Sequence, residues 1–187
     1  MQISDGEKLI LIMLSEIYKE LNIKGEIDPE FLQSAISSQN IWGIQWKYSG
    51  IPFETQDTPP KVREVVDILD MWRSIERAYK NLSKEDQKKF EEEDVNLFGK
   101  DPKFPGFDGN NESEYMNIAS FLINELGRFQ EFKERSLNAH MPTLETYQRM
   151  LHVFEEIRKT FSNKPMTLTQ LIAVLKERIH PEFRGSV

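Results

Sequence analysis

The segment 62–82 carries the strongest structural signal in the chain. Its apolar side chains recur every three or four residues, and its charged side chains fall on the other faces. This spacing is typical of an α-helix that buries one face. The apolar positions are Val62, Val65, Leu69, Trp72, Ile75, Tyr79 and Leu82. We therefore predict a long helix here, at the centre of the fold.

Helix-start signals divide the rest of the chain into further helical segments. Ser4 and Glu7 have the spacing of a capping box, and Thr167 and Gln170 repeat it near the other end. Behind the first box, apolar residues follow at helical spacing, namely Leu9, Ile10, Met13, Leu14, Ile17 and Leu21. Alternating patterns long enough for a sheet are absent. We predict an all-α, compact globule of about seven helices that share a common interior, as one domain over residues 1–187.

Two later helices, beginning near Asn111 and after Pro142, are expected to pack on the central helix. They follow the longest irregular segment, 94–110, which contains several glycines and prolines. Long loops in compact domains are often functional. Its end, 106–112, is therefore a candidate binding loop.

The charge balance limits the classes of partner. The chain has 31 acidic and 24 basic residues, a formal charge of -7, and no Lys/Arg-rich tail or stripe. General nucleic-acid binding through phosphate contacts is therefore disfavoured. The longest apolar run, Leu9 to Leu14, is far shorter than the roughly 20 residues that span a bilayer. No signal peptide is evident, so we expect a cytoplasmic protein that does not bind membranes.

The residue inventory also limits the chemistry. The chain has no cysteine, which excludes disulfides, thiolate nucleophiles and cysteine-ligated zinc. Its three histidines never have the spacing of a helical metal pair. Motifs of nucleotide-binding, kinase and hydrolase families are also missing. We expect neither a metal nor a cofactor.

A group of motifs in the second half of the chain resembles the YfbU-like family. The matching positions are Gly106, Phe107, Asp108, Glu112, Tyr115, Glu125, Gly127, Arg128, Asn138, Ala139, Pro142 and the run Tyr147 to Leu151. The stretch Asp67 to Trp72 is similar to the family's central helix, so the resemblance covers roughly residues 62–155. It implies a bacterial all-helical fold without an assigned activity. The family's occasional fusion to a helix-turn-helix segment implies a ligand-sensing role.

Charged residues on apolar helix faces are the first site candidates. Glu125 and Arg128 are three residues apart on the helix that begins near Asn111, on a flank shared with Phe121 and Phe132. They form either a plain salt bridge or the lining of a ligand site. Glu76 falls within the apolar stripe of the central helix. It is either a functional carboxylate or a partly solvated group at the edge of the stripe.

The loop and the helix after Pro142 add further candidates. Asp108 and Glu112 offer oxygen atoms near a helix start, but their segment lacks the glycine and the final glutamate of a calcium loop. It is therefore either a turn that leads to a helix cap or the border of an anion site. His140 lies in the break before Pro142 and is either a polar cap or a site residue. Tyr147 and Arg149 belong to the family motif; Tyr147 faces inward, whereas Arg149 points away and is either solvated or reserved for a partner.

These candidates favour a ligand- or partner-binding domain with a possible regulatory role. Its partner would be a small ligand or a protein, bound at the 106–112 loop and the Glu125/Arg128 flank. One alternative is an enzyme with a charged pocket formed by Glu125, Arg128, Glu76 and His140. The other is a homo-oligomer that buries exposed aromatic side chains such as Trp42 and Trp46.

Overall fold

The structure, a computed structural model, describes residues 3–54, 57–92, 101–160 and 164–183. Within these ranges the chain forms eight α-helices and two short 3-10 helices. In chain order they are α1 (Asp5–Glu20), α2 (Pro29–Ser37), α3 (Trp42–Lys47), α4 (Pro60–Lys80), α5 (Lys84–Glu92), α6 (Ser113–Asn124), η2 (Gln130–Phe132), α7 (Leu144–Arg158), α8 (Leu168–Lys176) and η3 (Pro181–Phe183). The one β-type pairing in these ranges is an isolated bridge between Phe107 and Asn138. The predicted all-α fold is confirmed.

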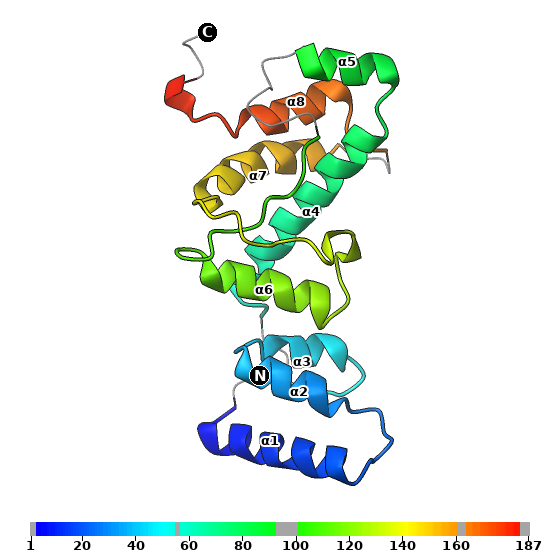
Figure 1. Ribbon diagram of the computed structural model, residues 1–187, viewed down its shortest axis with the longest axis vertical. Helices are drawn as coiled ribbons and strands as arrows, with labels where there is room; N and C mark the ends of the chain where they lie inside the picture. Colours follow the sequence, from blue (N-terminus) through cyan, green and yellow to red (C-terminus); the bar gives the residue numbers. More distant parts are fainter. Residues whose placement is uncertain (1–2, 55–56, 93–100, 161–163, 184–187) are drawn as a thin grey trace.

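Helix α4 is the centre of the main core, as its apolar period predicts. Helices α6, α7 and α8 all pack against it (Figure 1). Trp72 is fully buried on α4, and its ring lies 6.0 Å from that of Phe104 and 5.8 Å from that of Tyr147. The core therefore joins the central helix to the loop before α6 and to the first turns of α7.

The capping signals at both ends of the chain work as expected. The Ser4 side chain accepts a hydrogen bond from the Glu7 amide, and the Glu7 side chain accepts one from the Ser4 amide. Thr167 and Gln170 form the same reciprocal pair at the start of α8. Both capping boxes are confirmed.

Helix α6 ends earlier than its apolar period predicts. It stops at Asn124, although the apolar pattern continues to Phe129. Gly127 has φ +63° and Phe129 has φ +51°, both in the left-handed region that terminates helices. The Arg128 amide then donates back to the carbonyl of Leu122 at 2.9 Å. The predicted helical flank shared by Glu125 and Arg128 is wrong because these residues lie beyond the helix.

The molecule is elongated, and its N-terminal helices occupy one end. Helices α1, α2 and α3 lie beyond α6 in Figure 1, whereas α5 and α8 lie at the opposite end. A small second core joins α2 and α3 to Phe121 of α6. Among the described helices, α1 packs mainly on α2. The predicted common interior is therefore wrong for α1, of which only Ser15 is buried.

The predicted irregular segment before α6 lies partly outside the described residues, which resume at residue 101. Residues 101–112 follow an irregular path along the main core, with Phe104 and Phe107 buried in it. The loop is therefore anchored by its aromatic side chains.

Candidate functional site

Helix α1 exposes almost its whole apolar stripe. The side chains that form it are 51% to 66% exposed, and we call them the α1 face: Leu9, Ile10, Met13, Leu14, Ile17 and Leu21. Exposed aliphatic residues are ordinary when scattered, but a contiguous set marks an interaction surface. The apolar period predicts this stripe correctly, but the prediction that it faces the common interior is wrong.

The stripe stays exposed because α1 packs on α2 through a different side. Ser15 is buried there and its Oγ donates to the Leu11 carbonyl at 2.7 Å. Leu11, Ile12 and Tyr18 are half-buried on the same side. Helix α1 is therefore apolar on two sides and has a neighbour on one of them.

An apolar groove runs beside the α1 face, where α1 meets the loop before α2. Its volume is about 340 Å³. We call it the α1 groove; it is lined by Leu11, Leu14, Ser15, Ile17, Tyr18, Ile23, Ile27, Pro29 and Leu32. Leu14 and Ile17 belong to both the face and the groove, so the two form one continuous surface.

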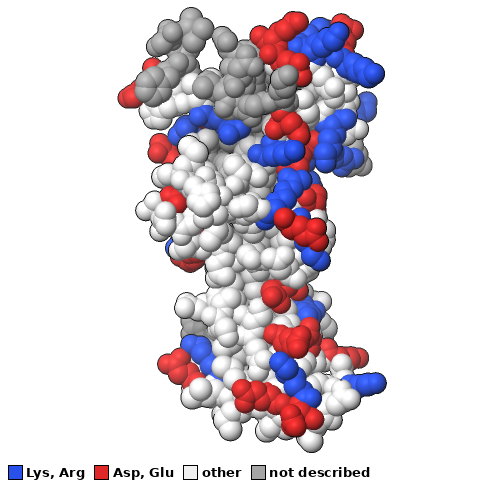
Figure 2. Space-filling view, viewed as in Figure 1, with Lys and Arg blue, Asp and Glu red and all other residues white. Residues whose placement is uncertain are grey.

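The border of the α1 face is acidic. At 100° per residue, Glu16 lies at one border of the stripe and Glu7 at the other. Glu20 falls at the edge of the stripe itself, between Leu9 and Met13. The two lysines of the helix point elsewhere: Lys8 pairs with Asp5 at 2.7 Å, and Lys19 extends toward α2. In Figure 2 the end of the molecule that carries α1 shows white, uncharged side chains next to acidic and basic ones.

Part of the family motif surrounds one buried carboxylate, that of Glu112. Glu112 is 7% exposed and accepts four hydrogen bonds. The amides of Thr143 and Leu144 donate to its Oε1 at 2.7 Å each. The Asp108 amide at 2.9 Å and the Thr143 hydroxyl at 2.7 Å donate to its Oε2. Glu112 thus caps the start of α7, where the Thr143 side chain makes no capping bond of its own.

These contacts set the charge state of Glu112. Burial acts to raise the pKa of its carboxyl, but the hydrogen bonds from Asp108, Leu144 and Thr143 outweigh burial and hold the pKa below its ordinary value. The pKa of Asp108 is lowered as well, by hydrogen bonds from the Asn110 amide and the Asn111 side chain. Both groups are therefore held as carboxylates.

We expect this lowered pKa to appear as acid sensitivity. Because the pKa is lower in the folded chain, ionised Glu112 stabilises the fold above its ordinary pKa of 4.5. That contribution is lost as the pH falls below 4.5 through the folded-state value. Urea unfolding over a pH series should show a steeper acid loss in the natural chain than in Glu112→Gln, which cannot titrate. Equal slopes would contradict the role given to Glu112.

Tyr147 and Gly106 complete this internal junction. The Tyr147 hydroxyl donates to the Gly106 carbonyl at 2.6 Å, and burial raises the pKa of the phenol. Gly106 has φ +95°, and a Cβ there would lie 2.2 Å from the Leu137 carbonyl oxygen. Asp108, Glu112 and Tyr147 are therefore brought together, as a structural tie between the loop and α7. Their polar atoms are hydrogen-bonded within the protein.

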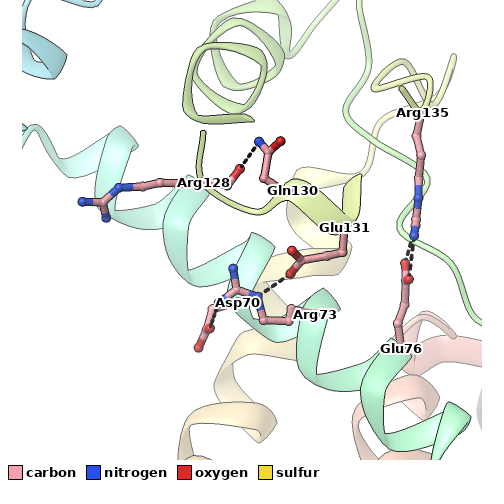
Figure 3. A network of polar contacts seen from close by, with 7 residues as sticks. All are labelled: Asp70, Arg73, Glu76, Arg128, Gln130, Glu131 and Arg135. Carbon is pink, nitrogen blue, oxygen red and sulfur yellow. Dashed lines mark hydrogen bonds and ion pairs between the residues drawn. The ribbon is translucent and has the colours of Figure 1, made fainter. Parts of the chain in front are cut away.

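Glu76 belongs to a separate pair. Arg135 donates two hydrogen bonds to it, of 2.7 and 3.0 Å (Figure 3). The Phe104 amide donates a third, at 3.0 Å. Glu76 is 6% exposed, so the predicted solvated edge is wrong. No local pattern predicts Arg135 as its partner, because Arg135 lies 59 residues away in an irregular segment.

The remaining candidates lie in other surroundings. Arg128 stacks over the Trp46 ring at 4.4 Å and, within the described residues, makes no ion pair with Glu125, which is exposed. Figure 3 shows Arg128 directed away from Glu76. His140 is exposed, and its amide donates to the Asn138 side chain at 2.9 Å. The predicted charged pocket of Glu125, Arg128, Glu76 and His140 is therefore not assembled.

Arg149 and the tryptophans also differ from expectation. Arg149 is half-buried and donates to the Glu177 carbonyl beyond α8 at 3.3 Å, so it ties α7 to α8. Trp42 and Trp46 are half-buried, with their rings 5.0 Å apart and that of Trp42 5.5 Å from Phe121. Both indole rings pack within the chain, so the exposed apolar residues of the described ranges are found mainly on the α1 face.

The fold and its internal ties define an all-helical protein organised around a central amphipathic helix. A family model described as the YfbU domain matches residues 1–174. The chain therefore belongs to the YfbU domain family, and the match includes α1 as well as the motifs around Glu112. Among the described helices, none combines the length and apolar character needed to cross a bilayer.

Proposed function

We propose that this protein is a binding module for another polypeptide and that the α1 face is its binding surface. The observation that carries the proposal is a row of aliphatic side chains, each more than half exposed, beside an apolar groove. Leaving such a patch in water is unfavourable at about 25 cal/mol per Å². A covering protein removes this cost.

The chemistry of the border favours a protein over a membrane surface. Amphipathic helices that lie on membranes carry Lys and Arg on their polar face. The α1 face instead has Glu7 and Glu16 along its borders and Glu20 at the edge of the stripe, and the lysines of α1 are engaged elsewhere. Anionic lipid headgroups would repel this arrangement. A regulatory consequence of binding remains a prediction implied by the family.

Site-specific photo-crosslinking tests the proposal. Met13, at the middle of the α1 face, is replaced by p-benzoylphenylalanine, and the full chain is irradiated in extract of its own cells. The matched control carries the same group at Lys88, an exposed position on α5 at the opposite end of the molecule. We expect protein adducts from position 13 and few from position 88. Equal yields, or no adduct from position 13, would refute the α1 face as a binding surface.

The small-ligand form of the original hypothesis gains no support at its predicted loop. Asp108, Glu112 and Tyr147 donate and accept within the protein, and the Glu125/Arg128 flank is not formed. Partner binding through α1 is thus the form of the hypothesis that the geometry favours.

A further inference from the structure

We propose that the partner covering the α1 face is a second copy of this chain, in a symmetric dimer. This inference rests on the proposed function, because it names the occupant of the same surface.

The surface is self-complementary in shape and chemistry. Met13 and Ile10 are exposed on the α1 face, and the α1 groove lies on the side of this face formed by Leu14 and Ile17. Leu14 and Ile17 therefore belong to the exposed row and to the groove. A two-fold axis near these residues would place the exposed side chains of each copy in the groove of the other. Isologous contacts of this kind are the commonest in homo-oligomers and close on themselves.

The place of α1 leaves room for such a contact. Helix α1 forms one end of the elongated molecule, and the bulk of the main core lies away from it (Figure 1). Two copies can therefore meet end to end through α1, the α1 groove and the loop before α2. The remaining helices would point away from the axis.

The size of the surface suits a dimer. The α1 face and Ile23, which is 47% exposed, together offer several hundred Å² of apolar surface, at or above the largest patch of a typical monomer. One partner in a standard interface contributes about 800 Å². The face and groove supply most of this area, and the acidic borders supply a polar rim.

Charge predicts how salt should act on this dimer. Each copy carries a formal charge of -7, and both rims are acidic. The two copies therefore repel each other at long range, and the contact itself is apolar. Raising ionic strength toward about 1 M, where the Debye length is about 3 Å, should tighten the dimer. Binding to a basic partner protein would weaken under the same change.

Sedimentation velocity of the purified full chain over a concentration series tests the inference. We expect a species of twice 22.0 kDa that dissociates on dilution and strengthens with salt. The double variant Met13→Glu/Ile17→Glu should raise the dimer dissociation constant by at least about 100-fold, because it buries charges at the centre of the interface. Met141→Glu, an equally exposed methionine outside α1, should leave the constant unchanged.

The α1 variant should fold, since the replaced side chains are exposed in the single chain, and its circular dichroism checks this. A chain that sediments as a monomer at every concentration would overturn the dimer. So would a dimer unaffected by Met13→Glu/Ile17→Glu. A monomer whose position 13 still crosslinks to a different protein would overturn the dimer and leave the proposed function standing. A monomer without adducts at position 13 would end both.

Discussion

Replacing Glu112 with alanine is expected to lower the free energy of unfolding by about 3–5 kcal/mol. The change removes one carboxylate that accepts from three backbone amides and one hydroxyl. These donors are buried between the loop and α7, so they would lose their acceptor without gaining water. Helix α7 would also lose its cap. Urea unfolding at neutral pH, followed by circular dichroism, measures the loss.

Glu125→Ala is the matched control for this substitution. Glu125 is an exposed carboxylate just beyond the same helix, α6, that Glu112 precedes. Its removal should change the free energy of unfolding by no more than about 0.5 kcal/mol. If the two variants were equally stable, the loop would not depend on Glu112.

Replacing Arg135 with methionine should cost about 3–5 kcal/mol, because it leaves Glu76 buried without its cation. Methionine keeps an apolar stem of similar length, so the loss reports the charge rather than the packing. The double variant Glu76→Gln/Arg135→Met should be more stable than Arg135→Met alone. A neutral amide oxygen can still accept from the Phe104 amide, and no unpaired charge remains.

A surface pair on the same helix provides the comparison. Arg73 of α4 pairs with Glu131 of η2, and both side chains are substantially exposed (Figure 3). Arg73→Met should therefore cost only about 0–1 kcal/mol, plus a small loss from its stacking over Phe129 at 4.4 Å. Equal losses at Arg73 and Arg135 would contradict the buried role of the Glu76 pair.

The helices and their starts could be predicted because they depend on local sequence. The period of α4 and the two capping boxes are contained within a few residues, so they predict helices and their starts directly. The end of α6 was missed because Phe129 continues the apolar period while adopting a left-handed backbone. Gly127 was the available signal for that end.

The partners of the buried carboxylates could not be predicted because they come from distant segments. Glu112 caps a helix whose N-cap residue, Thr143, lies 31 residues later, and Glu76 meets Arg135 across 59 residues. The apolar period of a helix likewise predicts which of its faces is apolar, but it does not predict what covers that face. For α4 the cover is the rest of the chain; for α1 it is not.

Methionine oxidation footprinting in intact cells tests the coverage of the α1 face most directly. Met13 and Met141 are 60% and 62% exposed in the single chain, so they should react with a brief pulse of oxidant at similar rates if nothing covers either. We predict that Met13 is oxidised several-fold more slowly than Met141, and that Met13→Glu/Ile17→Glu chains show unchanged Met141 reactivity. Equal oxidation of Met13 and Met141 in the natural chain would contradict a protein partner on the α1 face.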